Sequence, residues 1–238
     1  MDAKDNILDV TGLTVSFDGQ EVISDINFSV KKGDVFAVLG PNGAGKSVLF
    51  RALVGLVAYK GAVVWKKDIK VNYVPQRLSI EKDFPIDVGE FMAIRAGKNS
   101  AVISKALELT GLDGNFILDK KLASLSGGQF QRVMIAWSIL NDPDVILFDE
   151  PMTGIDVGGE ETIYNLLYKL NKTRGTTILI ISHDLGMVFK YSTSVLCLNK
   201  TMFCLGHPHE VITEENMAHI YGHLTSAHDH NHSHHGNN

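Results

Sequence analysis

The chain has 238 residues, of which 45% are hydrophobic and 21% charged, as expected of a folded globular protein with one large or two small domains. Its net charge of −5 argues against nucleic-acid binding, which favours a basic face. No apolar run approaches the ~20 residues that cross a bilayer, and the first residues lack the basic-then-apolar pattern of a secretion signal.

The two cysteines, Cys197 and Cys204, do not form a CxxC pair. We therefore expect no disulfide framework, but two small core residues on neighbouring strands. This reading favours a reducing, cytosolic setting.

The first forty residues have the pattern of β structure. Apolar and polar residues alternate at 8–17 and 26–30, and the turn signal Asp18-Gly19 separates the two stretches. Residues 35–39 form a continuous apolar run, typical of a buried strand. Residues 61–65 and 69–74 predict two further strands.

Directly after the apolar run comes the phosphate loop, Gly40-Pro41-Asn42-Gly43-Ala44-Gly45-Lys46-Ser47, followed by apolar residues at helical spacing. In such a strand–loop–helix unit the loop N–H groups and the helix dipole both favour phosphate. Gly43 and Gly45 let the backbone wrap closely around phosphate oxygens. Lys46 is placed to reach the β- and γ-phosphates, and Ser47 to bind Mg²⁺. The sequence predicts nucleoside triphosphate binding.

Residues 77–140 change character and predict a helical insertion. Helices are expected at 88–96, at 100–110 with Ser100 as the cap, and at 129–140. The last follows Ser126-Gly127-Gly128, so its free N–H groups form a second anion-binding terminus. The two termini belong to different subdomains. We therefore expect two copies of the chain arranged head to tail, each covering the other's nucleotide.

From residue 144 the α/β pattern returns. A buried strand at 145–148 ends in Asp149-Glu150, where one carboxylate can hold Mg²⁺ and the next can polarise an attacking water. A second buried strand at 176–181 leads to His183, which either faces the same γ-phosphate or is merely structural. A hairpin at 195–205 and a helix at 213–221 complete the pattern.

Taken together, these motifs resemble the nucleotide-binding subunits of ABC transporters over nearly all of residues 7–222. Gln76 matches the Q-loop, Leu125 to Gln129 the signature, Asp156 the D-loop and His183 the switch histidine. The resemblance implies an α/β fold, with a P-loop NTPase (RecA-like) core, an antiparallel β subdomain and a helical subdomain at about 77–140.

The resemblance also implies roles. Glu150, His183 and Lys46 would be catalytic, and Ser47, Gln76 and Asp149 would hold Mg²⁺. ATP would be bound by Phe17, Gly40, Pro41, Asn42, Gly43, Ala44, Gly45, Lys46, Ser47, Val48, Gln76, Ser126, Gly127, Gly128, Gln129 and Asp156. The partners would be a second copy, an integral-membrane permease and through it a substrate-binding protein, but no nucleic acid. The subunit would lie peripherally on the cytoplasmic face of the inner (plasma) membrane.

Two positions depart from the family pattern without removing a phosphate or Mg²⁺ ligand. Val48 stands where a second hydroxyl residue is usual, and Gly154-Ile155-Asp156 replaces the commoner Ala-Leu-Asp.

Residues 73–77 and 84–88 are similar to ATPases of bacterial zinc, manganese and iron importers. We favour zinc import, with manganese or iron import, a soluble ABC ATPase and a non-hydrolysing cassette as alternatives. Residues 227–238 are of low complexity and predict a disordered tail. Its imidazoles are suited to Zn²⁺, although a solvated polar tail or an expression tag would also be histidine-rich. The tail ligands would be His228, His230, His232, His234 and His235.

Overall fold

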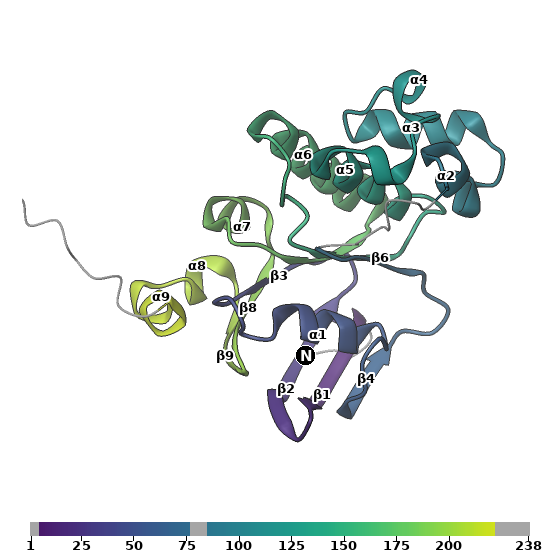
Figure 1. Ribbon diagram of the computed structural model, residues 1–238. Coiled ribbons are helices and arrows are strands. Elements are labelled where there is room, and N and C mark those ends of the chain that lie inside the picture. Colours follow the sequence, from purple (N-terminus) through teal and green to yellow (C-terminus); the bar gives the residue numbers. More distant parts are fainter. Residues whose placement is uncertain (1–4, 77–84, 222–238) are drawn as a thin grey trace, which may run out of the picture.

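The computed structural model describes residues 5–76 and 85–221 (Figure 1). An antiparallel sheet has the order β2-β1-β4, built from β1 (Asn6–Phe17), β2 (Gln20–Lys31) and β4 (Lys60–Trp65). β1 and β2 form a long hairpin whose turn, Asp18-Gly19, has positive φ at both residues, 50° and 78°. Such dihedrals match the twist of the flanking strands, and the predicted turn is confirmed.

A six-stranded sheet carries the order β5-β6-β7-β3-β8-β9. Its strands are β3 (Val35–Leu39), β5 (Val71–Val74), β6 (Val145–Asp149), β7 (Thr177–Ile181), β8 (Ser194–Asn199) and β9 (Thr201–Gly206). The first five in spatial order run parallel, and β9 pairs antiparallel with β8. The carboxyl ends of β5, β6, β7 and β3 therefore meet at one edge, where open α/β sheets bind ligands.

Both faces of this sheet are covered. Phe36 and Val38 of β3 pack into a core with α1 (Lys46–Leu53) and the antiparallel sheet, whereas Ala37 and Leu39 join the core of the larger helical layer. Burial on both faces explains why the parallel strands are continuously apolar in sequence.

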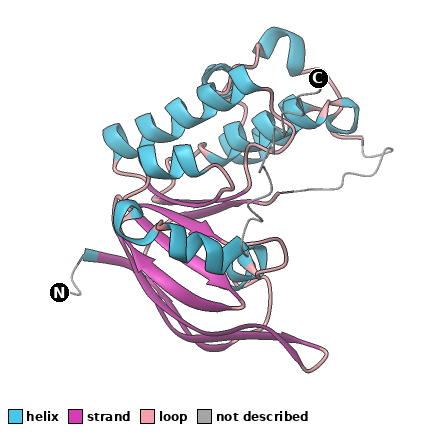
Figure 2. Cartoon of the chain, turned by 90° about the vertical axis from the view of Figure 1, so that its left-hand side faces the viewer, coloured by secondary structure: helices cyan, strands magenta, loops and turns pink. Residues whose placement is uncertain are grey.

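The helices gather on the side away from the antiparallel sheet (Figures 1 and 2). They are α2 (Val88–Ala96), α3 (Ser100–Leu109), α4 (Gly114–Ile117), α5 (Gly127–Ser138), α6 (Val157–Arg174), α7 (Leu185–Tyr191), α8 (Pro208–Val211) and α9 (Glu214–Tyr221). Among the described residues, no helix has both the length and the apolar character needed to span a bilayer.

The α/β architecture is as predicted, with local corrections. Asn99 rather than Ser100 caps α3, because its side chain accepts from the N–H of Val102. The helix expected at 129–140 begins two residues earlier, at Gly127. The proposed limits of the domain (7–222) and of its helical part (77–140) stay predictions, and residues 77–84 and 222–238 lie outside the described residues.

The cysteine expectation was partly wrong. Cys197 and Cys204 do lie on neighbouring strands, but they are joined by a disulfide. They are direct partners in the β8–β9 pair, with Cα atoms 4.8 Å apart, a separation that suits a disulfide. The cysteines therefore no longer argue for a reducing compartment.

Candidate nucleotide site

The phosphate loop connects the end of β3 to the start of α1. Gly45 occupies the N-cap of α1 with φ 96°, and a Cβ there would lie 2.3 Å from Ile23 Cγ2, so only glycine fits. Lys46 folds over its own loop, donating from Nζ to the carbonyls of Gly40 at 2.8 Å and Pro41 at 3.0 Å. Burial lowers the pKa of Lys46, and the negative charges of Glu150 and Asp149 oppose that shift. The loop thus holds a buried lysine at the start of the helix.

Asp149, the last residue of β6, is only 1% exposed. Its Oδ1 accepts from Ser47 Oγ at 3.0 Å and its Oδ2 from the Tyr73 hydroxyl at 3.2 Å. Burial raises the pKa of Asp149, and the two hydrogen bonds counteract that rise. Burial, with the charge of Asp149, also raises the pKa of Tyr73 to about 12, so the phenol stays protonated and donates. A hydroxyl and a carboxylate oxygen side by side are ligands that suit Mg²⁺.

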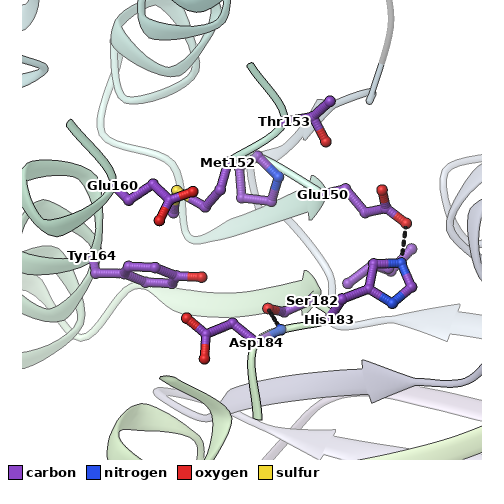
Figure 3. Close-up of a pocket in the computed structure, with 10 residues that line it drawn as sticks. Glu150, Met152, Thr153, Glu160, Tyr164, Ser182, His183 and Asp184 are labelled. Atoms are coloured by element: carbon purple, nitrogen blue, oxygen red, sulfur yellow. Dashed lines mark hydrogen bonds and ion pairs between the residues drawn. The ribbon is translucent and has the colours of Figure 1, made fainter. Parts of the chain in front are cut away.

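Two side chains contact the carboxylate of Glu150, the first residue after β6. Gln76 Nε2 donates to its Oε2, and His183 Nε2 lies 2.7 Å from its Oε1 (Figure 3). These residues follow β5, β6 and β7, which are neighbours in the sheet. Glu150 has φ 51°, a left-handed conformation that is uncommon for a residue other than glycine. The backbone turn and two side-chain contacts therefore fix this carboxylate.

A cavity of about 260 Å³ lies beside Glu150 and His183, toward α6. Figure 3 shows Glu160, Tyr164 and Asp184 around it. Burial raises the pKa of Tyr164, which keeps its hydroxyl protonated. Sequence patterns did not reveal this recess, because its walls come from the loop after β6, from α6 and from the loop after β7.

The signature segment, Leu125–Gln129, starts α5. Ser126 Oγ accepts from the N–H of Gln129 while Gln129 Oε1 accepts from the N–H of Ser126, both at 3.2 Å, forming a capping box. A Cβ on Gly128 would lie 2.6 Å from the carbonyl oxygen of Gly154, so a glycine is needed where α5 meets the loop before α6. Further along α5, Arg132 forms an ion pair with Asp156.

The structure thus brings together one group of the expected site residues: Lys46, Ser47, Gln76, Asp149, Glu150 and His183. The second group consists of Ser126 to Gln129 and Asp156, at the starts of α5 and α6. These helices lie on the opposite face of the six-stranded sheet from α1 (Figure 1). Phe17 ends β1 with 46% of its surface exposed. Val48 packs against the core around α1. The tail histidines lie outside the described residues.

Sequence reasoning missed Tyr73 as a site residue and considered it only as part of a subfamily motif. The Tyr73 hydroxyl donates to Asp149, and the Arg51 side chain hydrogen-bonds to the same phenol. The sequence did hold a signal for such a residue, since the carboxylate of Asp149 at the end of a buried strand needs hydrogen-bond donors. Finding which donors required the register of β5 against β6.

A phosphate loop in a parallel sheet, with an acidic pair, an amide and an imidazole at adjacent strand ends, defines a P-loop nucleoside triphosphatase. The family model described as ABC transporter matches residues 23–153, and the chain belongs to that family. It is therefore an ATP-binding ATPase of the ABC type.

Relatives resemble the chain over almost its whole length. The zinc import ATP-binding protein ZnuC of Yersinia pestis is 37% identical, covering 93% of this chain and 90% of that protein. The protein of the same name from Pseudomonas syringae pv. syringae is 34% identical, covering 98% and 91%. Among solved structures, cbiO1 from Clostridium perfringens, part of the ABC transporter complex cbiONQ, aligns with a TM-score of 0.72 at 30% identity, covering 90% of this chain and 94% of that one.

Proposed function

We propose that the chain is the ATP-hydrolysing subunit that powers zinc import through a membrane permease. The observation that carries hydrolysis is Glu150, held between Gln76 and His183 beside an intact phosphate loop. The relatives named as zinc import proteins support the choice of cargo.

In this proposal Glu150 accepts a proton from the attacking water as general base. His183 orients the Glu150 carboxylate and contacts the γ-phosphate, while Lys46 leaves its loop carbonyls to neutralise charge that develops in the transition state. Ser47, Asp149 and Gln76 would hold Mg²⁺, which neutralises phosphate charge when bound. Phe17 would stack on adenine.

The signature segment supports a second step in the proposal. Ser126 and Gly128 would contact the γ-phosphate bound by another copy, so that two chains close head to tail over two ATP molecules. The chain would lie on the cytoplasmic face of the inner membrane, and closure would be relayed through Gln76 to an integral-membrane permease. A substrate-binding protein would deliver the metal to that permease. The histidine-rich tail would bind zinc and slow turnover when zinc is abundant.

The test is whole-cell metal content, measured by elemental mass spectrometry in metal-depleted medium. Cells lacking the chain should lose zinc, and the wild-type gene should restore it. The Glu150→Gln variant should not restore cellular zinc. The control Glu160→Gln removes a carboxylate from the adjacent recess and should restore most of the zinc.

If cellular manganese or iron falls while zinc does not, the imported metal is manganese or iron rather than zinc. Unchanged metal content would favour a soluble ABC ATPase. Restoration of cellular zinc by the Glu150→Gln variant would favour a non-hydrolysing cassette.

A further inference from the structure

Asp149 belongs to a ring of contacting side chains, here called the Asp149 ring, that also includes Ser47, Arg51 and Tyr73. Ser47 and Arg51 are one helical turn apart on α1 and therefore lie on the same face of that helix. Tyr73 comes from β5, which pairs with β6, the strand that ends at Asp149. Ser47 Oγ donates to Oδ1 of Asp149, and the Tyr73 hydroxyl donates to Oδ2. Arg51 hydrogen-bonds to the same phenol, so the ring ties the helix of the phosphate loop to two strands.

The hydrogen bonds of the Asp149 ring have a fixed direction. The guanidinium of Arg51 can only donate, so the phenol oxygen of Tyr73 must accept from it. A phenol carries a single proton, and with Arg51 on its oxygen that proton points to Oδ2 of Asp149, 3.2 Å away. Arg51 therefore orients the hydroxyl of Tyr73, and Tyr73 in turn supplies a donor to one oxygen of the carboxylate.

This arrangement decides which oxygen of Asp149 is available to a metal ion. The last torsion of an aspartate side chain has broad, roughly two-fold preferences, so the chain alone does not fix the plane of the carboxylate. Tyr73 at Oδ2 and Ser47 at Oδ1 fix that plane from both sides. Asp149 is almost completely buried, so the protein supplies these partners in place of bulk water. The metal-facing oxygen is thus in place before an ion arrives, which lowers the cost of binding.

The end of β5 assigns different partners to the two acidic residues that close β6. Tyr73, within β5, donates to Asp149, whereas Gln76, just after the strand, donates to Glu150. Glu150 has a second contact, to His183, and the Asp149 ring takes no part in it. The hydroxyl of Tyr73 therefore acts on the buried carboxylate and not on the one beside the recess. Its removal should affect metal binding rather than the group proposed to activate water.

We propose that Tyr73 is a positioning residue for Mg²⁺. Its hydroxyl, oriented by Arg51, holds Oδ2 of Asp149 and so keeps Oδ1 turned toward Ser47, where the ion would bind. In this role Tyr73 touches neither the ion nor the nucleotide and acts through Asp149 alone. The inference rests on the Mg²⁺ role proposed above for Ser47 and Asp149, and deepens it.

The experiment compares nucleotide binding with and without Mg²⁺, so that metal binding is measured apart from hydrolysis. The full-length chain is titrated with a fluorescent, non-hydrolysable ATP analogue in Mg²⁺ and in EDTA. The ratio of the two dissociation constants is here called the Mg²⁺ effect. Tyr73→Phe removes the hydroxyl and keeps the ring. The control, Tyr59→Phe, removes the hydroxyl of another tyrosine that lines the same apolar cavity as the Tyr73 ring. Circular dichroism verifies that each variant is folded.

The wild type and the control should show the same Mg²⁺ effect. In Tyr73→Phe the Mg²⁺ effect should fall about three- to tenfold, as expected for the loss of one hydrogen bond, while binding in EDTA stays as in the wild type. In ATPase assays the Mg²⁺ concentration that gives half the maximal rate should rise by a similar factor. The rate at saturating Mg²⁺ should stay close to that of the wild type, because Glu150 keeps its own partners.

Arg51→Gln tests the orienting step through an exposed side chain, and it decides the question even if Tyr73→Phe folds poorly. It should lower the Mg²⁺ effect in the same direction. Added to Tyr73→Phe, it should change the Mg²⁺ effect by less than about twofold, because Arg51 acts through the phenol. The charge of Arg51 itself affects the pKa of Asp149 less than either of the hydrogen bonds from Ser47 and Tyr73 does.

An unchanged Mg²⁺ effect in Tyr73→Phe would overturn the proposal, because Asp149 would then be oriented without the phenol. Equal weakening in Mg²⁺ and in EDTA would overturn it as well, by showing that Tyr73 only supports the phosphate loop. If Mg²⁺ does not strengthen binding even to the wild type, the Mg²⁺ role of Ser47 and Asp149 fails together with this inference. Zinc import is judged separately by cellular metal content.

Discussion

At the scale of single residues, the nucleotide site holds charges where burial opposes them. Burial lowers the pKa of Lys46 and raises that of Asp149, so each shift disfavours the charged form. Asp149 nevertheless keeps hydrogen bonds from Ser47 and Tyr73 that compensate in part. Such groups contribute to binding and chemistry at a cost in stability.

Asp149→Asn should therefore stabilise the nucleotide-free chain while abolishing Mg²⁺-dependent hydrolysis. The amide cannot ionise, and it can still bond to Ser47 and Tyr73. Because the folded-state pKa of Asp149 is raised, its ionised form destabilises the fold above that pKa, and the penalty disappears as the pH falls through it.

The variant should therefore melt above the wild type at pH 7. The difference should shrink as the pH is lowered. Thermal unfolding followed by circular dichroism without nucleotide or Mg²⁺ measures it, with Asp18→Asn in the exposed β1–β2 turn as control. A variant that melts below the wild type at pH 7 would contradict this reasoning.

At the scale of elements, α5 and α6 are joined by an ion pair for which a glycine, Gly159, leaves the room. Arg132 of α5 reaches Asp156 at the start of α6 across Gly159. A Cβ on Gly159 would lie 2.0 Å from Arg132 Nη2 and 2.6 Å from Ile155 Cγ2. The helix behind the signature segment is thereby tied to the loop that precedes α6.

The neighbouring glycines of α6 give a matched test. A Cβ on Gly158 would meet only Asp156 Oδ2, at 3.9 Å. Gly158→Ala should raise the free energy of unfolding by about 0.5–1 kcal/mol, the usual gain in a helix. Gly159→Ala should instead lower it by about 1 kcal/mol or more, since Arg132 must leave Asp156. Urea denaturation distinguishes the two, and equal stabilisation by both would show that Arg132 has room to move.

What the sequence could predict at this scale depended on adjacency in the chain. The phosphate loop, the buried strands and the acidic pair after β6 are contiguous, so their local pattern sufficed. Three interactions were not predicted, because each depends on how separate elements pack or pair. They are the hydrogen bond from Tyr73 to Asp149, the ion pair between Arg132 and Asp156, and the Cys197–Cys204 disulfide. Helices α4 and α8 span four residues each, too few to show a period.

At the scale of the whole molecule, the two helix starts that we propose to bind phosphate belong to different layers of the chain. The phosphate loop starts α1, and the signature segment starts α5 in the helical layer (Figure 1). Ser126 and Gly127 at the start of the signature segment are exposed in the single chain, as the proposed contact with another copy requires.

Glu150→Gln should accumulate a dimer with ATP and Mg²⁺, because the nucleotide that holds the copies together would not be hydrolysed. The amide is nearly isosteric, so the structure around Gln76 and His183 should persist. Light scattering coupled to size-exclusion chromatography measures the mass, with Glu160→Gln as the control expected to behave as the wild type. A Glu150→Gln chain that stays monomeric with ATP and hydrolyses it at the full rate would remove Glu150 from its proposed role.

The place of β3 in the sheet has a consequence for the order in which the molecule opens. β3 is hydrogen-bonded on both sides, to β7 and β8, and its last four residues are fully or almost fully buried, whereas β5 and β9 lie at the sheet edges. Amide hydrogens in β3 should therefore exchange with solvent only through openings close to global unfolding, and those of the edge strands through smaller fluctuations. The phosphate loop follows an interior strand of the sheet, so a chain that opens partly, from the sheet edges, should keep the backbone that binds phosphate.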